Sequence, residues 1–276
     1  MADATRTQQT TVWGLLPAAT VALAAVFLFA LLDESVGYPL LVAGVVGAAI
    51  TDARRLSDGL LPDLLCIAAG LTIISLIPLK ADISWPMFVT FGVVLGAAVA
   101  VPWWLSRRVF GVDAVRYPWG GWRWSRAQWI YLVAVIGAAY FILPFYFLSS
   151  GVYQNWPAIH TPSEIGRLLV GVNAVGLWDE LFFICTVFAL LRRHFATWQA
   201  NVLQATIFVS FLWELGYQAW GPALTVPFAL IQGAIFQLTK NLTYVVVLHL
   251  LFDVIVFLVI LHAHNPTWPH PFPLVG

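Results

Sequence analysis

Charged residues are scarce in this sequence of 276 residues: they make up 9% of the chain, whereas hydrophobic residues make up 61%. A soluble globular domain has about a quarter charged residues and about half apolar ones. The composition therefore excludes an ordinary soluble domain. A membrane-spanning helix needs ~20 apolar residues, so a chain of this length with short connections holds about eight or nine spans and no separate soluble domain.

Cysteine is equally rare. Cys66 and Cys185 both lie inside apolar runs, and they do not provide the paired framework of a small secreted domain. We therefore expect no disulfide. The formal net charge is zero, and the sequence shows neither a glycine-rich phosphate-binding loop nor a repeat of the kind seen in soluble proteins. Nothing here indicates a nucleic acid partner, and the expected surroundings are the lipid bilayer.

We predict an all-α, polytopic transmembrane helix bundle with about eight or nine spans. The segment Val36–Ile50 is short for a crossing, and its glycines and Pro39 leave open a tight helical pair or a re-entrant segment. The candidate spans are Thr11–Leu32, Val36–Ile50, Leu60–Leu79, Trp85–Leu105, Ala127–Leu148, Ile165–Leu191, Trp198–Gly216, Leu224–Leu238 and Leu242–His262.

The basic residues fall mostly on one side of such a bundle. Alternating the loops leaves only Lys80 and Arg167 on the second side. Because Lys and Arg gather in short cytoplasmic loops, we expect the first side, with the amino terminus, to be cytoplasmic. The residues on that side are Arg6, Arg54, Arg55, Arg107, Arg108, Arg116, Arg123, Arg126, Arg192, Arg193 and Lys240.

The longest loop on the basic side, Ser106–Arg126, interleaves arginines with tyrosine and tryptophan. This mixture suits the lipid headgroup layer, and a dock for substrate or lipid is the alternative. We expect three regions along the chain, and this loop ends the first of them. The regions are the amino-terminal spans with the basic-aromatic loop (1–126), a membrane-embedded core (127–265) and a short proline-rich tail (266–276).

Two adjacent carboxylates, Asp179 and Glu180, stand inside an apolar run that continues to Leu191. An aspartate at the centre of a spanning helix costs roughly 2.5–3.5 kcal/mol, so an acidic pair there marks a functional site that faces protein or water instead of lipid. Neighbours on a helix are about 100° apart, so we expect one carboxylate to line the site and the other to brace it.

Two further polar side chains lie at a depth comparable to that of the acidic pair, and a third lies deeper. His249 and Asp253 are four residues apart and share one face of the last span. Glu180 lies ~18 Å from the basic boundary of its span, and His249 and Asp253 lie ~13 Å and ~20 Å from theirs. Glu214 is deeper in its span, at ~24 Å, within reach only through its long side chain.

These residues carry a resemblance to a known family. Asp179-Glu180, the basic stop at 190–195, the segment 228–242 and His249-x-x-x-Asp253 occur in the order and spacing of four motifs. Over residues 173–261 the chain thereby resembles the CAAX prenyl endopeptidase and bacteriocin-processing family of intramembrane proteases, also called the Abi family. The resemblance implies a membrane-associated peptide or protein substrate, which includes prenylated peptides.

The resemblance also implies residue roles. Asp179 would activate water, Glu180 would brace it, and His249 with Asp253 would orient the water and stabilise the oxyanion. The chain differs from the family pattern in three places: Asp179 replaces a glutamate, Ile184 an arginine and Leu212 a histidine. Glu214, two residues beyond Leu212, is a further catalytic candidate, although it lies ~200° around the helix. With one motif histidine left, no zinc or other divalent metal is inferred.

Two alternatives to an active protease stay open at this stage. The first is a catalytically inactive family member that acts as a membrane scaffold or binds a partner, which the apolar residues Ile184 and Leu212 favour. The second is a proton-coupled transporter that uses the same carboxylates and histidine as a relay. The absence of an inverted sequence repeat disfavours the transporter.

Overall fold

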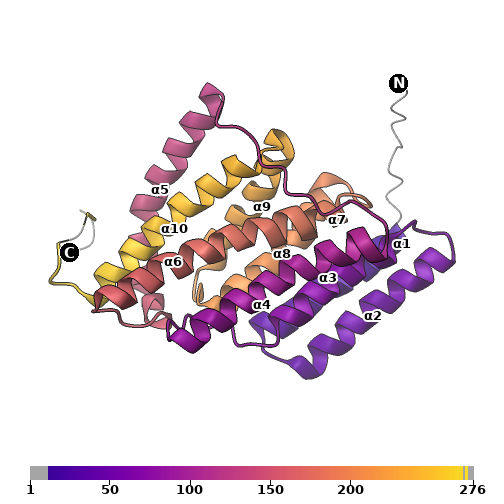
Figure 1. Cartoon of the computed structure of the whole chain (residues 1–276), viewed down its shortest axis with the longest axis horizontal. Coiled ribbons are helices and arrows are strands. Elements are labelled where there is room, and N and C mark those ends of the chain that lie inside the picture. The colour runs from indigo at the N-terminus through magenta and orange to yellow at the C-terminus, as the bar shows by residue number, and fades with distance from the viewer. Residues whose placement is uncertain (1–11, 270, 273–276) are drawn as a thin grey trace.

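The computed structural model describes residues 12–269, 271 and 272, and within them every regular element is a helix. The helices form a bundle of long, roughly aligned rods (Figure 1). In order they are α1 (Val12–Ala25) with η1 (Val26–Ala30), α2 (Glu34–Ala53), α3 (Leu60–Ile74), α4 (Trp85–Trp104) with η2 (Leu105–Val109), α5 (Arg126–Ser150), η3 (Val152–Asn155), α6 (Pro162–Asp179) with η4 (Glu180–Phe188) and α7 (Ala189–Leu191), α8 (Thr197–Leu215), α9 (Pro222–Thr239) and α10 (Leu242–His264).

The helical bundle predicted from the sequence is confirmed, and each predicted span coincides with one of these helical stretches. Among the described residues, seven stretches are long and apolar enough to cross a membrane. The other two are α3, an apolar helix of 15 residues, and α8. The polar residues of α8 explain its lower hydropathy. Asn201 and Gln204 are buried among neighbouring helices, so this helix has less need of a continuous apolar surface.

The short segment at 36–50 forms part of a tight helical pair. α2 is 20 residues long and packs against α1, because glycines on α2 let the two backbones approach closely. A Cβ atom at Gly37 would lie 2.6 Å from Leu28, and one at Gly44 would lie 3.0 Å from the Pro17 carbonyl oxygen. The re-entrant alternative is therefore not what the chain adopts.

One end of the bundle carries the loops 54–59, 110–125, 192–196 and 240–241, and we call it the arginine-rich end. Arg193 Nη1 donates to both carboxylate oxygens of Asp63 at 2.6 and 2.7 Å, which ties the end of α7 to the start of α3. Thr243 donates to the Gly120 carbonyl at 2.8 Å, which ties the start of α10 to the long basic loop. That loop runs across this end from α4 to α5 (Figure 1).

The opposite end carries the loops 31–33, 75–84, 151–161 and 216–221. Asn155 Nδ2 donates to the Gly216 carbonyl at 2.8 Å, and Arg167 Nε donates to the Ile83 carbonyl at 2.7 Å. Successive helices therefore run in alternate directions, as the charge analysis assumed. Arg6 lies outside the described residues, and the cytoplasmic position of the amino terminus stays a prediction.

The continuous stretch α6–η4–α7 runs through the middle of the bundle, with α4, α8, α9 and α10 packed around it (Figure 1). Its start is fixed by a capping box in which the Thr161 side chain and the Glu164 carboxylate bond each other's backbone amides. Aromatic rings fill the space around its centre: Trp178 stacks on Phe182, and Phe183 stacks on Phe208 with ring centroids 4.4 Å apart. The acidic pair lies in this densely packed region.

Candidate active site

The acidic pair lies where the central helix changes its winding. Asp179 ends α6, and Glu180 begins the π-helical stretch η4. A π-helical turn closes its hydrogen bonds over five residues instead of four, and such turns occur frequently at functional sites. The two neighbouring carboxylates lie on either side of the same histidine ring on α10.

His249 is the centre of the site. Its Nδ1 atom lies 2.7 Å from Glu180 Oε1, and its Nε2 atom lies 3.8 Å from Asp179 Oδ2 and 3.9 Å from Asp253 Oδ1. The predicted proximity of the acidic pair to the His249 ring is therefore confirmed. The ring also packs edge-on against Phe228, with centroids 4.9 Å apart.

Glu180 is fully enclosed. It has an exposed fraction of 0%, and its Oε1 accepts a second hydrogen bond of 2.7 Å from Gln232 Nε2 on α9. Because Oε1 accepts the Gln232 amide hydrogen, the arrangement favours a proton on His249 Nδ1, which leaves Nε2 directed toward the aspartates. Glu180 therefore contacts His249 and Gln232, and its bracing role stays a prediction.

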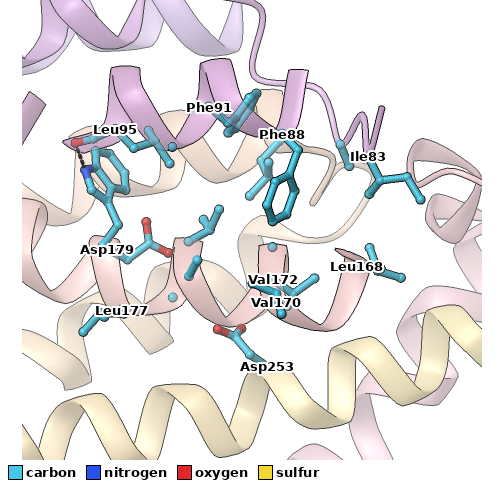
Figure 2. Close-up of a pocket in the computed structure, with 18 of the residues that line it drawn as sticks. Ile83, Phe88, Phe91, Leu95, Leu168, Val170, Val172, Leu177, Asp179 and Asp253 are labelled. Carbon is cyan, nitrogen blue, oxygen red and sulfur yellow. Dashed lines mark hydrogen bonds between the residues drawn. The ribbon is translucent and has the colours of Figure 1, made fainter. Parts of the chain in front are cut away.

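Asp179 and Asp253 face a cavity. The cavity has a volume of about 430 Å³, and Asp179, His249 and Asp253 line it. Figure 2 shows Asp179 on α6 directed toward the space below α4, and the Asp253 carboxylate reaching from α10 toward α6. A Cβ atom at Gly176 would collide with that carboxylate, so only glycine leaves room for it there.

The structure does not bring Glu214 into this cluster. Glu214 Oε1 accepts a hydrogen bond of 2.9 Å from the Leu79 amide and fixes the loop that follows α3. The prediction from depth that Glu214 could reach the site is wrong, because its side chain points around α8 toward the loop after α3. Leu212 lines the same cavity as His249, whereas Ile184 is buried at 1% exposure.

Sequence reasoning missed two residues of the site, Gln232 and Tyr217. Gln232 is a buried polar residue in the apolar helix α9, and this isolation was a signal that could have identified it. Tyr217 lines the cavity and is close enough to Asp253 and Asp179 for electrostatic interaction with them. Tyr217 follows Gly216, which comes directly after α8 and has a positive φ of 127°. No pattern in the sequence identified Tyr217 as a residue of the site.

The donor set gives no indication of a metal centre. Within residues 12–269, 271 and 272, no group of three or more His, Cys, Asp or Glu side chains is arranged to hold a metal ion.

Residues 161–255 match the family model described as type II CAAX prenyl endopeptidase Rce1-like. Over this segment, about a third of the chain, the protein is therefore similar to the CAAX prenyl endopeptidase and bacteriocin-processing family. The Rce1-like segment includes Asp179, Glu180, His249 and Asp253, and it confirms the resemblance found between residues 173 and 261. No curated protein and no solved structure matches the chain.

Proposed function

We propose that this protein is an intramembrane endopeptidase that hydrolyses a peptide bond in a membrane-associated polypeptide. The observation that carries the proposal is the convergence of Asp179, Asp253 and His249 Nε2 in the wall of a cavity, inside an Rce1-like segment. Their separations of 3.8 and 3.9 Å are longer than direct hydrogen bonds, and they bring the three polar groups together at one place in the cavity wall.

Asp179 is the proposed general base. It takes a proton from the water as the water oxygen attacks the substrate carbonyl carbon, and it returns the proton to the amine nitrogen when the C–N bond breaks. One water molecule is consumed, and a carboxyl and an amino terminus are released. Glu180 holds His249 through Nδ1, and His249 Nε2 and Asp253 orient the water.

Tyr217 is the proposed donor to the oxyanion. The tetrahedral intermediate carries negative charge on the former carbonyl oxygen, and a pre-positioned neutral donor stabilises it without reorganisation. The indole of Trp178 is engaged, because its Nε1 donates to the Leu95 carbonyl at 2.7 Å. The Tyr217 hydroxyl, which belongs to the same cavity wall as Asp179 and Asp253, is therefore the favoured donor.

The proposal is tested with purified protein in liposomes and peptides anchored by a prenyl group or by a transmembrane segment. Asp179→Asn is expected to lower the hydrolysis rate by roughly 10²–10⁴-fold, because it removes the proton acceptor while retaining the shape of the side chain. Asp113→Asn is the matched control, since Asp113 pairs with Arg107 and Arg116 at the arginine-rich end.

The scaffold reading is the second candidate, and the apolar residues at Ile184 and Leu212 favour it. A folded wild-type protein that cleaves neither class of peptide, and that behaves identically to Asp179→Asn, would support the scaffold and refute the protease.

A further inference from the structure

The cavity extends from the site toward one end of the bundle only. Its lining includes Lys80, Asp82 and Ile83 from the loop that precedes α4, together with Phe88 on α4 and Leu168 on α6. Within the described part of the chain, no residue of the four loops at the arginine-rich end lines it. In Figure 2 Asp179 lies at one end of the cavity and Ile83 at the other.

The two ends of the bundle differ sharply in basic residues. The cavity mouth belongs to the opposite end, where Lys80 and Arg167 are the basic residues of the described chain. Arg167 is held there by the Ile83 carbonyl and by the Trp85 ring, whose centroid lies 4.9 Å from its guanidinium carbon. The positive-inside rule places the arginine-rich end in the cytoplasm and the cavity mouth on the other side.

The cavity is also open between α4 and α6. Gly92 and Gly96 of α4 line it, and a Cβ atom at either position would meet nothing within 4 Å. Val170, on the facing side of α6, lines the cavity and is 56% exposed. Glycines on α2 let two helices pack closely, whereas the glycines on α4 leave an opening between α4 and α6. The carboxylates of Asp179 and Asp253 are directed into the cavity behind this opening.

Resting on the proposed endopeptidase function, we propose that the substrate is a membrane-anchored polypeptide that enters from the non-cytoplasmic leaflet, between α4 and α6. From Leu168 to Asp179 the helix advances eleven residues, which is ~16 Å. An extended chain covers that distance in about five residues. The scissile bond therefore lies about five residues inside the cavity mouth, and the apolar lining accommodates apolar side chains along that length.

The side of entry is tested by labelling, which requires no activity. Lys80→Cys is placed at the mouth and Arg116→Cys in the long basic loop, and a charged methanethiosulfonate reagent is added to intact cells. We expect Lys80→Cys to react from outside and Arg116→Cys to react only after permeabilisation. The native Cys66 and Cys185 are buried, and the wild type gives their background. The reverse labelling pattern would overturn the proposal.

The occupant is tested by protection. An anchored apolar peptide present at about ten times its Kd slows the labelling of Lys80→Cys roughly tenfold by mass action. Gly96→Leu in the same background fills the cavity and is expected to abolish this protection. Gly137→Leu on α5, where a Cβ also meets nothing within 4 Å, is expected to leave it intact. Absence of protection in the Lys80→Cys protein would overturn the assignment of the occupant.

The two proposals fail in different ways. Outside labelling with peptide protection but without hydrolysis refutes the endopeptidase and leaves the entry route standing. Hydrolysis together with labelling of Lys80→Cys only from the cytoplasm refutes the entry route and leaves the endopeptidase standing.

Discussion

His249 and Glu180 form a buried pair in which Nδ1 and Oε1 lie 2.7 Å apart, with exposed fractions of 4% and 0%. The pair fixes the orientation of the imidazole, so that its second nitrogen is presented to the two aspartates. The carboxylate that holds an imidazole on one side sets the tautomer and the orientation of the ring. The nitrogen on the other side of the ring is then suited to position a reactant.

Gln232 is expected to act through this pair. Gln232→Leu removes the amide that donates to Glu180, so His249 loses part of its support and the hydrolysis rate falls about tenfold. The hydrogen bond itself contributes about 1 kcal/mol, so the thermal unfolding temperature falls only slightly. Gln237→Leu, near the end of the same helix, is the control and should alter neither quantity. Equal rates for the two variants would show that Gln232 does not position the site.

Gly176 should be irreplaceable for a steric reason. Gly176→Ala places a methyl group where the Asp253 carboxylate lies, which forces that side chain away from His249 and costs about 1–3 kcal/mol of overpacking. We expect loss of hydrolysis and a lower unfolding temperature. Gly166→Ala on the same helix meets nothing within 4 Å and should stabilise the helix by roughly 0.5–1 kcal/mol. If Gly176→Ala retains wild-type hydrolysis, the Asp253 position is not needed for the reaction.

Tyr217→Phe removes one hydroxyl and leaves the ring packed between Phe147 and Trp156. Loss of one oxyanion donor lowers kcat by about 10²–10³-fold with little change in KM, because the bond strengthens only in the transition state. Steady-state kinetics measure both quantities. Tyr153→Phe, a residue whose ring contacts His264 outside the cavity, is the control. A rise in KM at constant kcat would instead assign Tyr217 to substrate binding.

Asp63 ties α3 to the end of the central helix. It is 3% exposed at the side chain and pairs with Arg193 at 2.6 Å and with His194 at 2.6 Å. Asp63→Asn leaves both partners without their carboxylate and should cost about 1–3 kcal/mol, since Arg193 is 35% exposed and water screens part of the loss. Asp113→Asn, at an exposed pair, should cost less than about 1 kcal/mol. Thermal unfolding in detergent compares them, and equal shifts would contradict the structural role of Asp63.

The sequence was sufficient to predict where the helices lie along the chain. It was not sufficient to predict which side chains of different helices contact each other. The apolar runs and the charge bias defined the nine helical stretches, because spanning a bilayer requires both length and apolar composition. The spacing of His249 and Asp253 placed them on one face. The π-helical start at Glu180 has no compositional signal. The angle of about 100° between neighbours predicted that the two carboxylates point in different directions, but not that Glu180 meets Nδ1 of His249 and Asp179 lies nearer Nε2.

The direction of a side chain around its helix was the harder problem. Glu214 and Asp253 are both carboxylates deep in apolar helices, yet one fixes a loop and the other faces His249. Depth follows from counting residues, whereas direction depends on which neighbours pack against the helix. Tyr217 was not predicted as a residue of the site for the same reason. The direction of its side chain depends on the turn at Gly216, which follows α8.

The final prediction separates a slow enzyme from a scaffold. Leu212 lines the same cavity as His249, so Leu212→His adds a second imidazole to that cavity. A general acid or base contributes ~10²–10⁴-fold, and the added imidazole should raise hydrolysis of anchored peptides above the wild-type rate. Ile184→Arg is tested beside it, because Ile184 stands where the family has arginine.

Asp179→Asn and His249→Ala are expected to abolish hydrolysis in both the wild-type and the Leu212→His backgrounds. Each variant must unfold at a temperature close to that of its parent, because removing one member of a buried polar cluster also costs stability. A rate gain that depends on Asp179 would show that the site is catalytic and limited by its missing histidine. If the wild type and the Leu212→His, Ile184→Arg double variant are both folded and equally inert toward prenylated and transmembrane peptides, the cluster holds the bundle together and the protein is a scaffold.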